Sequence, residues 1–186
     1  MTNLFVSGSG TEVGKTFVTT MLINEIRKTD RPIIALKPVI SGFADDDVGE
    51  SDTGLILEAL GLDVTPDNIE KVSPWRFRAP IAPTMAATLE GRELDIHEIA
   101  AFCQKNTAPN CIKIIEGVGG VMVPLTNQAT VLDLMVEVGA PVLLVVGSYL
   151  GTLSHTLTAL HTVQDHGLKV LGIVISESVD SEVPLS

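Results

Sequence analysis

Short apolar segments alternate along this chain with stretches of helical periodicity, and this alternation limits the folds that the chain can adopt. Each apolar segment is continuous rather than interrupted by polar residues, which is typical of strands buried on both faces of a sheet. We predict such strands at residues 4–6, 33–36, 111–115, 142–146 and 170–175. The sequence therefore predicts an α/β fold with a doubly wound, mostly parallel sheet flanked by helices.

Capping residues delimit the predicted helices. Ser51 and Asp52 are typical of a helix N-terminus, and Gly61 and Gly139 are typical of the positions at which helices end. The stretch 64–83 is rich in proline, and we expect it to be irregular. We predict helices at residues 16–28, 53–60, 96–104, 130–138 and 152–165.

Composition narrows the functional classes. The 186 residues include 23 acidic and 12 basic side chains, which argues against a nucleic-acid or anionic-membrane partner. No apolar run approaches the roughly 20 residues of a membrane helix, and no charged leader precedes an apolar stretch, so we expect a cytoplasmic protein. Cys103 and Cys111 are too few for a disulfide scaffold, and we expect free, buried thiols. The length fits one domain spanning residues 1–186.

The first predicted strand leads into a glycine-rich loop, GSGTEVGKT at residues 8–16. Its end, Gly14-Lys15-Thr16, fits a phosphate-binding P-loop, and it stands between a strand and a helix as that motif requires. Backbone N–H groups of Glu12, Val13 and Gly14 are expected to surround phosphate oxygens. Lys15 is expected to bridge the β and γ phosphates, and the Thr16 hydroxyl to hold Mg²⁺. The predicted sheet is therefore of the P-loop type.

Three charged residues stand where other predicted strands and helices begin or end. Lys37 follows the strand at 33–36, and it either stabilises charge on a transferred phosphoryl group or is a surface lysine. Asp52 is either a helix cap or a Mg²⁺ ligand. Glu116 follows the strand at 111–115 and opens EGVGG, in the position of the second nucleotide-binding motif of P-loop proteins. Thr16, Asp52 and Glu116 would suffice to hold Mg²⁺.

Glu12 is unexpected inside a phosphate-binding loop, because a carboxylate there repels a triphosphate. It is either a solvated loop charge, or it faces a second, cationic substrate, or it reaches Mg²⁺ through water.

Five segments together resemble the dethiobiotin synthetase family. They are GTEVGKT at residues 10–16, KPVISG at 37–42, SD at 51–52, EGVGG at 116–120 and LG-x-x-SH at 150–155. Each segment alone is unspecific, but their combination in this order and spacing is specific, and the resemblance covers nearly the whole chain.

The resemblance implies a reaction. Members of that family close a cyclic urea on 7,8-diaminopelargonate with CO₂, ATP and Mg²⁺, through a carbamate and a carbamic–phosphoric anhydride. By resemblance, Lys15, Lys37 and Thr11 are catalytic, Thr11, Glu12 and Ser41 contact the diamine or carbamate, Val118, Gly119 and Ser176 contact the nucleotide, and Thr16, Asp52 and Glu116 hold Mg²⁺.

The resemblance also implies a homodimer with the substrate at the subunit interface. The substrate carboxylate would meet the N-terminus of a partner helix, which here begins at Gly151, Thr152, Leu153 and Ser154. Family members carry an asparagine that reads the nucleobase where this chain has Ser176. They also continue for roughly one more strand and helix beyond Ser186, so we expect a domain that is short at its C-terminus.

Other hypotheses stay open. A P-loop switch ATPase of the positioning type has a similar architecture, but its loop carries a lysine where this chain has Ser9. The synthetase half of an amidating enzyme would need a glutaminase domain, for which 186 residues leave no room. An inactive relative would bind nucleotide without releasing phosphate, whereas a switch ATPase would release phosphate without the diamine.

Overall fold

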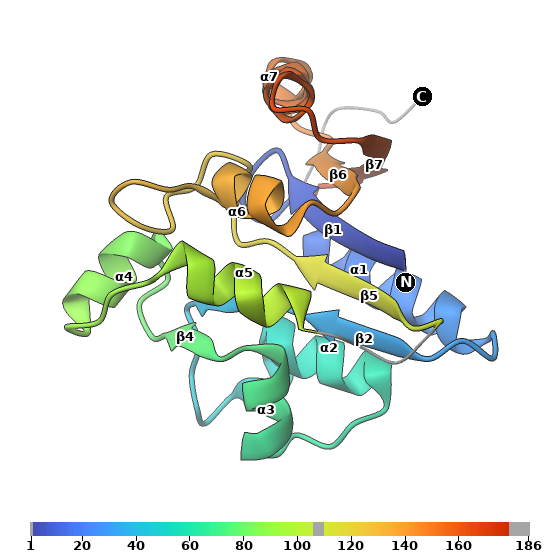
Figure 1. The fold of residues 1–186 in the computed structure, drawn as a ribbon, viewed down its shortest axis with the longest axis vertical. Helices are drawn as coiled ribbons and strands as arrows, with labels where there is room; N and C mark the ends of the chain where they lie inside the picture. The colour runs from blue at the N-terminus through green and yellow to red at the C-terminus, as the bar shows by residue number, and fades with distance from the viewer. Residues whose placement is uncertain (1, 106–109, 179–186) are drawn as a thin grey trace.

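The computed structural model describes residues 2–105 and 110–178, and Figure 1 shows the path of the chain. The predicted C-terminal shortness at Ser186 lies outside the described residues. The elements are β1 (Thr2–Gly8), α1 (Lys15–Arg27), β2 (Ile33–Leu36), β3 (Val39–Ser41), the 3-10 helix η1 (Val48–Glu50), α2 (Asp52–Leu60), α3 (Pro66–Val72), β4 (Trp75–Phe77), α4 (Pro83–Leu89), α5 (Ile96–Gln104), β5 (Ile112–Glu116), α6 (Val131–Val138), β6 (Val142–Gly147), α7 (Thr152–Asp165) and β7 (Val170–Ser176).

Among the described residues, the main sheet has five parallel strands in the order β2-β5-β1-β6-β7. Strand β1 lies at the centre, where Phe5 is in register with Ile115 of β5 on one side and Val142 of β6 on the other. Helices connect successive strands because parallel strands cannot be joined by tight turns. The predicted doubly wound α/β fold is confirmed.

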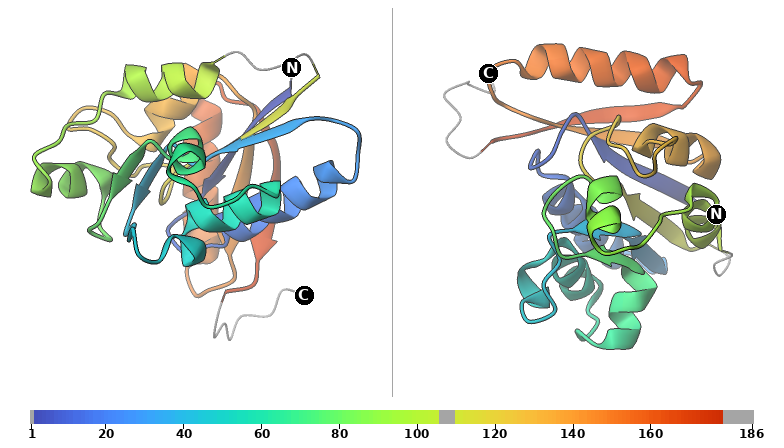
Figure 2. Two further views of the ribbon diagram at one scale, coloured as in Figure 1. Left: turned by 90° about the horizontal axis from the view of Figure 1, so that it is seen from below. Right: turned by 90° about the vertical axis from the view of Figure 1, so that its left-hand side faces the viewer.

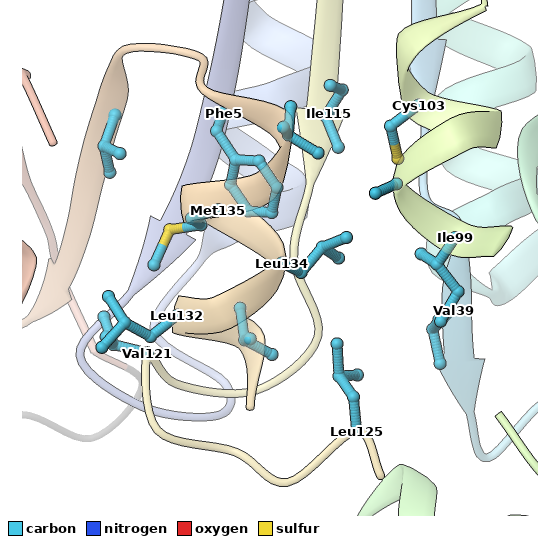
Figure 3. Close-up of a cluster of buried hydrophobic side chains, with 14 of the residues drawn as sticks. Phe5, Val39, Ile99, Cys103, Ile115, Val121, Leu125, Leu132, Leu134 and Met135 are labelled. Carbon is cyan, nitrogen blue, oxygen red and sulfur yellow. The ribbon is translucent and has the colours of Figure 1, made fainter. Parts of the chain in front are cut away.

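Helices cover both faces of this sheet (Figure 2). Side chains alternate along β1, so the fully buried Phe5 and Val6 point to opposite faces. Phe5 packs in a cluster with Cys103 of α5, Met135 of α6 and residues of α7 (Figure 3). Val6 packs in a second cluster with residues of α1 and α2. The carboxyl ends of the strands therefore form the edge at which a ligand can reach the sheet.

The proline-rich stretch 64–83 is more regular than we predicted. It forms α3 and β4, and β4 pairs with β3 in a separate two-stranded parallel sheet. The Thr65 hydroxyl accepts a hydrogen bond from the Asn68 N–H, and Pro66 occupies the first turn of α3. Proline suits that position because its missing N–H would have no partner there. The prediction of irregular structure was wrong for these segments.

Two strands differ from the continuous buried pattern that we expected. Strand β7 is at the edge of the sheet, and Leu171, Ile173 and Ile175 are 53%, 41% and 59% exposed. Strand β5 contains Lys113, which is buried although it interrupts an apolar run. Its ammonium donates hydrogen bonds to the carbonyl oxygens of Cys103 and Lys105, at 2.7 Å each.

Cys103 and Cys111 are free and buried, as predicted. Within residues 2–105 and 110–178, no helix is both long enough and apolar enough to span a membrane.

Candidate active site

The glycine-rich loop joins β1 to α1 at the carboxyl edge of the sheet. Gly14 caps α1 in the left-handed conformation, with φ of 88°. A Cβ at Gly14 would also collide with the Ser176 hydroxyl at the end of β7. Glycine is therefore required here for conformation and for space, and Ser176 lies directly beside the loop.

Lys15 is buried beneath this loop. Its Nζ donates a hydrogen bond to the Gly10 carbonyl oxygen at 2.9 Å. Burial, together with the nearby ammonium of Lys37, lowers the pKa of Lys15 to about 8, against the opposing pull of two carboxylates. A loop of backbone N–H groups with a lysine beneath it is suited to bind the phosphates of a nucleotide.

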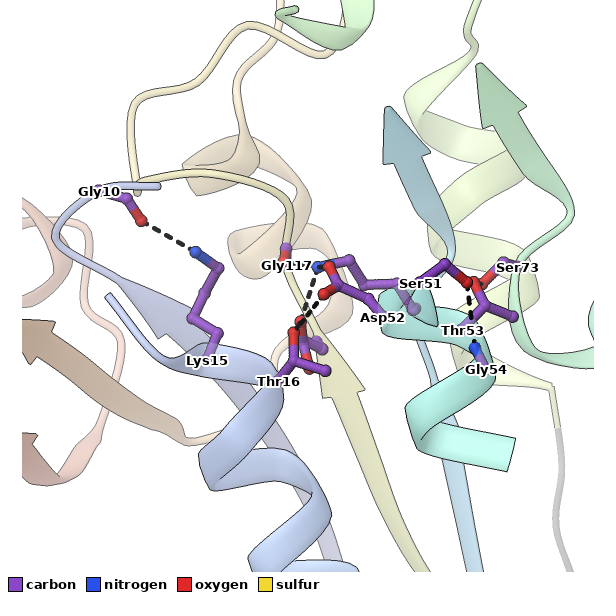
Figure 4. Close-up of polar contacts among 11 residues, drawn as sticks. Gly10, Lys15, Thr16, Ser51, Asp52, Thr53, Gly54, Ser73 and Gly117 are labelled. Atoms are coloured by element: carbon purple, nitrogen blue, oxygen red, sulfur yellow. Dashed lines mark hydrogen bonds and ion pairs between the residues drawn. The ribbon is translucent and has the colours of Figure 1, made fainter. Parts of the chain in front are cut away.

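Two carboxylates converge on Thr16 from separate elements, and Figure 4 labels Thr16 and one of the two, Asp52. The Thr16 hydroxyl oxygen lies 2.7 Å from Asp52 Oδ1 in the first turn of α2. It lies 2.8 Å from Glu116 Oε1 at the end of β5. Ser51 places Asp52 by capping α2, since its hydroxyl accepts a hydrogen bond from the Gly54 N–H. A hydroxyl carries a single hydrogen, so it can donate to only one of the two carboxylates at a time.

Lys37 binds the same two carboxylates. Its Nζ lies 2.6 Å from Glu116 Oε1 and 2.9 Å from Asp52 Oδ2. It also donates to the Gly117 carbonyl oxygen at 3.0 Å. Lys37 is 2% exposed and Glu116 is fully buried. These four groups form the ion cluster, which we define as Thr16, Lys37, Asp52 and Glu116.

Two members of the ion cluster, Lys37 and Asp52, favour each other's charged forms. Burial alone would lower the pKa of Lys37, but Glu116 and Asp52 outweigh it and raise that pKa. Burial alone would raise the pKa of Asp52, but Lys37 and the Thr16 hydroxyl outweigh it and lower that pKa. Lys37 and Asp52 are therefore ionised at neutral pH.

The ion cluster also fits a divalent cation. Glu116 Oε2 is buried and has no hydrogen-bond partner among the described residues, so one carboxylate oxygen is available for a ligand. Mg²⁺ prefers carboxylate and hydroxyl oxygens completed by water and phosphate oxygens. The described part of the chain holds no group of three or more His, Cys, Asp or Glu side chains suited to a metal. A cation here would thus depend on the Thr16 hydroxyl and on phosphate or water.

The loop after β5 packs against the glycine-rich loop. A Cβ at Gly120 would lie 3.2 Å from the Gly10 Cα, and the Val121 N–H donates to the Gly8 carbonyl oxygen at 3.1 Å. One at Gly119 would lie 3.5 Å from the Thr11 hydroxyl oxygen. The structure therefore places the half-buried Val118 and Gly119 beside Thr11 of the glycine-rich loop.

Some predicted site residues lie apart from the ion cluster. Glu12 is exposed with φ of 58°, and Ser41 is half-buried at the end of β3. Neither has a described contact with the cluster. Val13 is 4% exposed and packs in the core, so only its backbone is available to a ligand.

The predicted anion site at the start of α7 is also distant. Helix α7 follows β6 and lies at the opposite end of the sheet from α2 and β2 (Figure 1). Gly151 precedes the helix with φ of 96°, no side chain caps it, and the Thr152 hydroxyl donates to the Gly147 carbonyl oxygen at 2.6 Å. Leu153 is 78% exposed, and Ser154 is exposed as well.

The backbone acceptors of the two lysines could not be read from the sequence. The carbonyl oxygens of Gly10 and Gly117 receive hydrogen bonds from Lys15 and Lys37. A backbone carbonyl leaves no trace in the residue type, so only the glycine-rich character of both loops could have pointed to them.

Comparisons with known proteins identify the family of this chain. A protein family described as an AAA domain matches residues 2–184, a span that contains every site residue above. The ATP-dependent dethiobiotin synthetase BioD of Methylobacterium nodulans is 46% identical over 99% of this chain and 84% of its own length. The synthetase of the same name from Phenylobacterium zucineum is 46% identical over 99% of this chain and 80% of its own length. The synthetase of the same name from Caulobacter vibrioides is 46% identical over 97% of this chain and 82% of its own length.

Proposed function

This chain belongs to the dethiobiotin synthetase family, and we propose that its glycine-rich loop and ion cluster form the active site of that family's ATP-dependent ligase reaction. The reaction belongs to biotin biosynthesis and converts 7,8-diaminopelargonate, CO₂ and ATP to dethiobiotin, ADP and phosphate. The observation that carries the proposal is the convergence of Asp52 and Glu116 on both Lys37 and Thr16, the first residue after the P-loop lysine.

The nucleotide binds first in this scheme. Backbone N–H groups of residues 12–14 and the N-terminus of α1 surround the phosphates. The Lys15 ammonium donates a hydrogen bond to the Gly10 carbonyl oxygen in this structure. In the nucleotide complex it contacts the β and γ phosphates instead. Thr16, Asp52 and Glu116 hold Mg²⁺, which when bound neutralises phosphate charge. Val118, Gly119 and Ser176 contact the rest of the nucleotide.

Positioning and charge neutralisation then carry the chemistry. One substrate amine adds to CO₂ and loses a proton, which gives a carbamate. A carbamate oxygen attacks the γ-phosphorus, and ADP leaves. The second amine attacks the carbamoyl carbon and loses a proton, and phosphate leaves as the ring closes. Lys37 neutralises charge on the carbamate and the transferred phosphoryl group, and Thr11, Glu12 and Ser41 hold the substrate.

We place the substrate carboxylate at the start of α7 in a second copy of the chain. The first-turn N–H groups after Gly151 lack a side-chain cap, which supports an anion there. Mixing two inactive variants tests this arrangement. A Lys37→Met chain and a Ser154→Glu chain should together recover activity that neither has alone, because a mixed dimer contains one intact site. Recovery would be absent if each chain supplied its own α7.

Phosphate release tests the function directly. Release from ATP with Mg²⁺ and bicarbonate is expected only when 7,8-diaminopelargonate is present. Release without the diamine would instead identify a switch ATPase, and no release with any nucleotide would identify an inactive relative. Repeating the assay with CTP and GTP measures how strictly the site containing Ser176 selects the base.

A further inference from the structure

Three oxygen atoms of the protein already surround the Lys37 ammonium. A lysine ammonium has three N–H donors. Its partners here are Glu116 Oε1 at 2.6 Å, Asp52 Oδ2 at 2.9 Å and the Gly117 carbonyl oxygen at 3.0 Å. The side chain is 3% exposed, so water does not compete for these donors. Any contact between Lys37 and a phosphoryl group therefore requires Lys37 to leave at least one of these partners.

The partners of Lys37 are also the oxygens that would hold the metal. Both carboxylate oxygens of Asp52 have a partner. Oδ2 pairs with the Lys37 ammonium, and Oδ1 lies at hydrogen-bond distance from the Thr16 hydroxyl. Glu116 Oε1 contacts both the Lys37 ammonium and the Thr16 hydroxyl. Glu116 Oε2 has no hydrogen-bond partner among the described residues. An ammonium and a divalent cation would thus neutralise the same pair of carboxylates.

We propose that Lys37 is an internal counter-cation, which balances the magnesium site in the nucleotide-free enzyme and is released toward the phosphoryl group when Mg²⁺ and nucleotide bind. This inference rests on the metal site of the proposed function. It assigns Lys37 two successive partners, first the carboxylates and then the transferred group.

The geometry makes Lys37 the cation suited to this exchange. A buried carboxylate without a positive partner is costly, and Lys15 donates to Gly10 rather than to either carboxylate. Lysine carries its charge on a flexible four-carbon stem, so its ammonium can move without a shift of the backbone. Binding of Mg²⁺ to the carboxylates and movement of the Lys37 ammonium toward the phosphoryl group would then occur together.

Manganese binding to the nucleotide-free protein tests the exchange, with Mn²⁺ as a spectroscopic substitute for Mg²⁺. Lys37→Met should bind Mn²⁺ about tenfold more tightly than the unchanged protein, since no ammonium has to be displaced. Lys15→Met is the matched control, because it removes an equal charge near the same carboxylates without contacting them. Its affinity should rise by less than about threefold. Equal affinities in the two variants would overturn the proposal.

A measurement on the unchanged protein guards against misfolding of the variants. The ammonium groups of Lys37 and Lys113 are both buried and hydrogen-bonded, so both should be visible in ¹H–¹⁵N spectra of lysine side chains. Saturating Mg²⁺ with ADP should shift or abolish the Lys37 signal and leave the Lys113 signal unchanged. A Lys37 signal that stays in place would contradict the exchange. Neither measurement depends on turnover, so a failure of the ligase assay alone would count against the proposed function and not against the exchange.

Discussion

Lys37 and Lys113 are two buried lysines that lie near opposite ends of strand β5 and differ in their partners. Lys37 follows β2 at the carboxyl edge of the sheet and contacts two carboxylates, which raise its pKa despite burial. Lys113 stands near the start of β5 and donates to two carbonyl oxygens at the C-terminal end of α5, those of Cys103 and the capping residue Lys105, and burial lowers its pKa. Burial alone therefore does not identify a functional lysine. Its partners do, because carboxylates can exchange one cation for another, whereas helix-terminal carbonyls need a permanent donor.

The largest effect is expected when Lys37 is removed. Lys37→Met should lower kcat by roughly 10²–10³, the range found when one preorganised donor to a developing charge is lost. ATP affinity should change much less, because the proposed contact with the phosphoryl group develops in the transition state. Steady-state kinetics with varied ATP measures both quantities. A kcat within about threefold of that of the unchanged protein would contradict a catalytic role for Lys37.

A smaller effect is expected when Asp52, one of the two carboxylate partners of Lys37, is changed. Asp52→Asn keeps the size of the side chain and removes its charge, so the Mg²⁺ concentration for half-maximal activity should rise by about 10–100-fold. Asp95→Asn is the matched control, since Asp95 also stands at a helix N-terminus, where it accepts hydrogen bonds from His97 and Glu98. Equal Mg²⁺ requirements in both variants would show that Asp52 does not bind Mg²⁺.

Removal of Lys113 should affect stability and spare catalysis. Lys113→Met leaves two carbonyl oxygens without their donor, which is expected to cost about 2–4 kcal/mol of the free energy of unfolding. Urea unfolding measures this loss, and kcat of the folded variant should stay within about twofold. A large loss of kcat with normal stability would break the comparison between the two lysines.

The smallest effect is a pH dependence at Lys113. Because its pKa is lowered in the folded state, the unfolded chain binds more protons between the folded pKa and the ordinary lysine value near 10.4. The stability advantage of the unchanged protein over Lys113→Met should therefore be constant below the folded pKa and grow as pH rises above it. Urea unfolding of both proteins from neutral to alkaline pH measures this difference. A difference that shrinks with rising pH would mean that Lys113 is stabilised in its charged form.

The sequence predicted the fold well wherever the pattern was local. The five apolar strands and the glycine-rich loop are contiguous features, and the structure confirms the fold class. The exposure of Ile173 and Ile175 could not be predicted, because it depends on the place of β7 at the edge of the sheet and not on its composition. The cap of α3 was visible as Thr65-Pro66, but the surrounding prolines obscured it.

For the site, residue types were predicted better than their contacts. Thr16, Asp52 and Glu116 are far apart in the sequence, and the structure brings them to a shared centre. Their role in Mg²⁺ binding stays a prediction. The ion pairs of Lys37 were not predicted, since charge patterns along the chain do not reveal which end of a sheet each residue reaches. Lys113 was overlooked because its apolar neighbours dominate the pattern.

The central place of β1 also determines the order in which the protein can mature on the ribosome. Phe5 pairs with Ile115 and Val142, so the first strand to be synthesised has no neighbour in the sheet until more than half of the chain exists. At about 5–20 residues per second, roughly 7–30 seconds separate the emergence of β1 from that of β6. Such non-local pairing slows folding and leaves an apolar strand exposed to aggregation in the meantime. The glycine-rich loop, although close to the N-terminus, is consequently among the last parts of the molecule to reach its final shape.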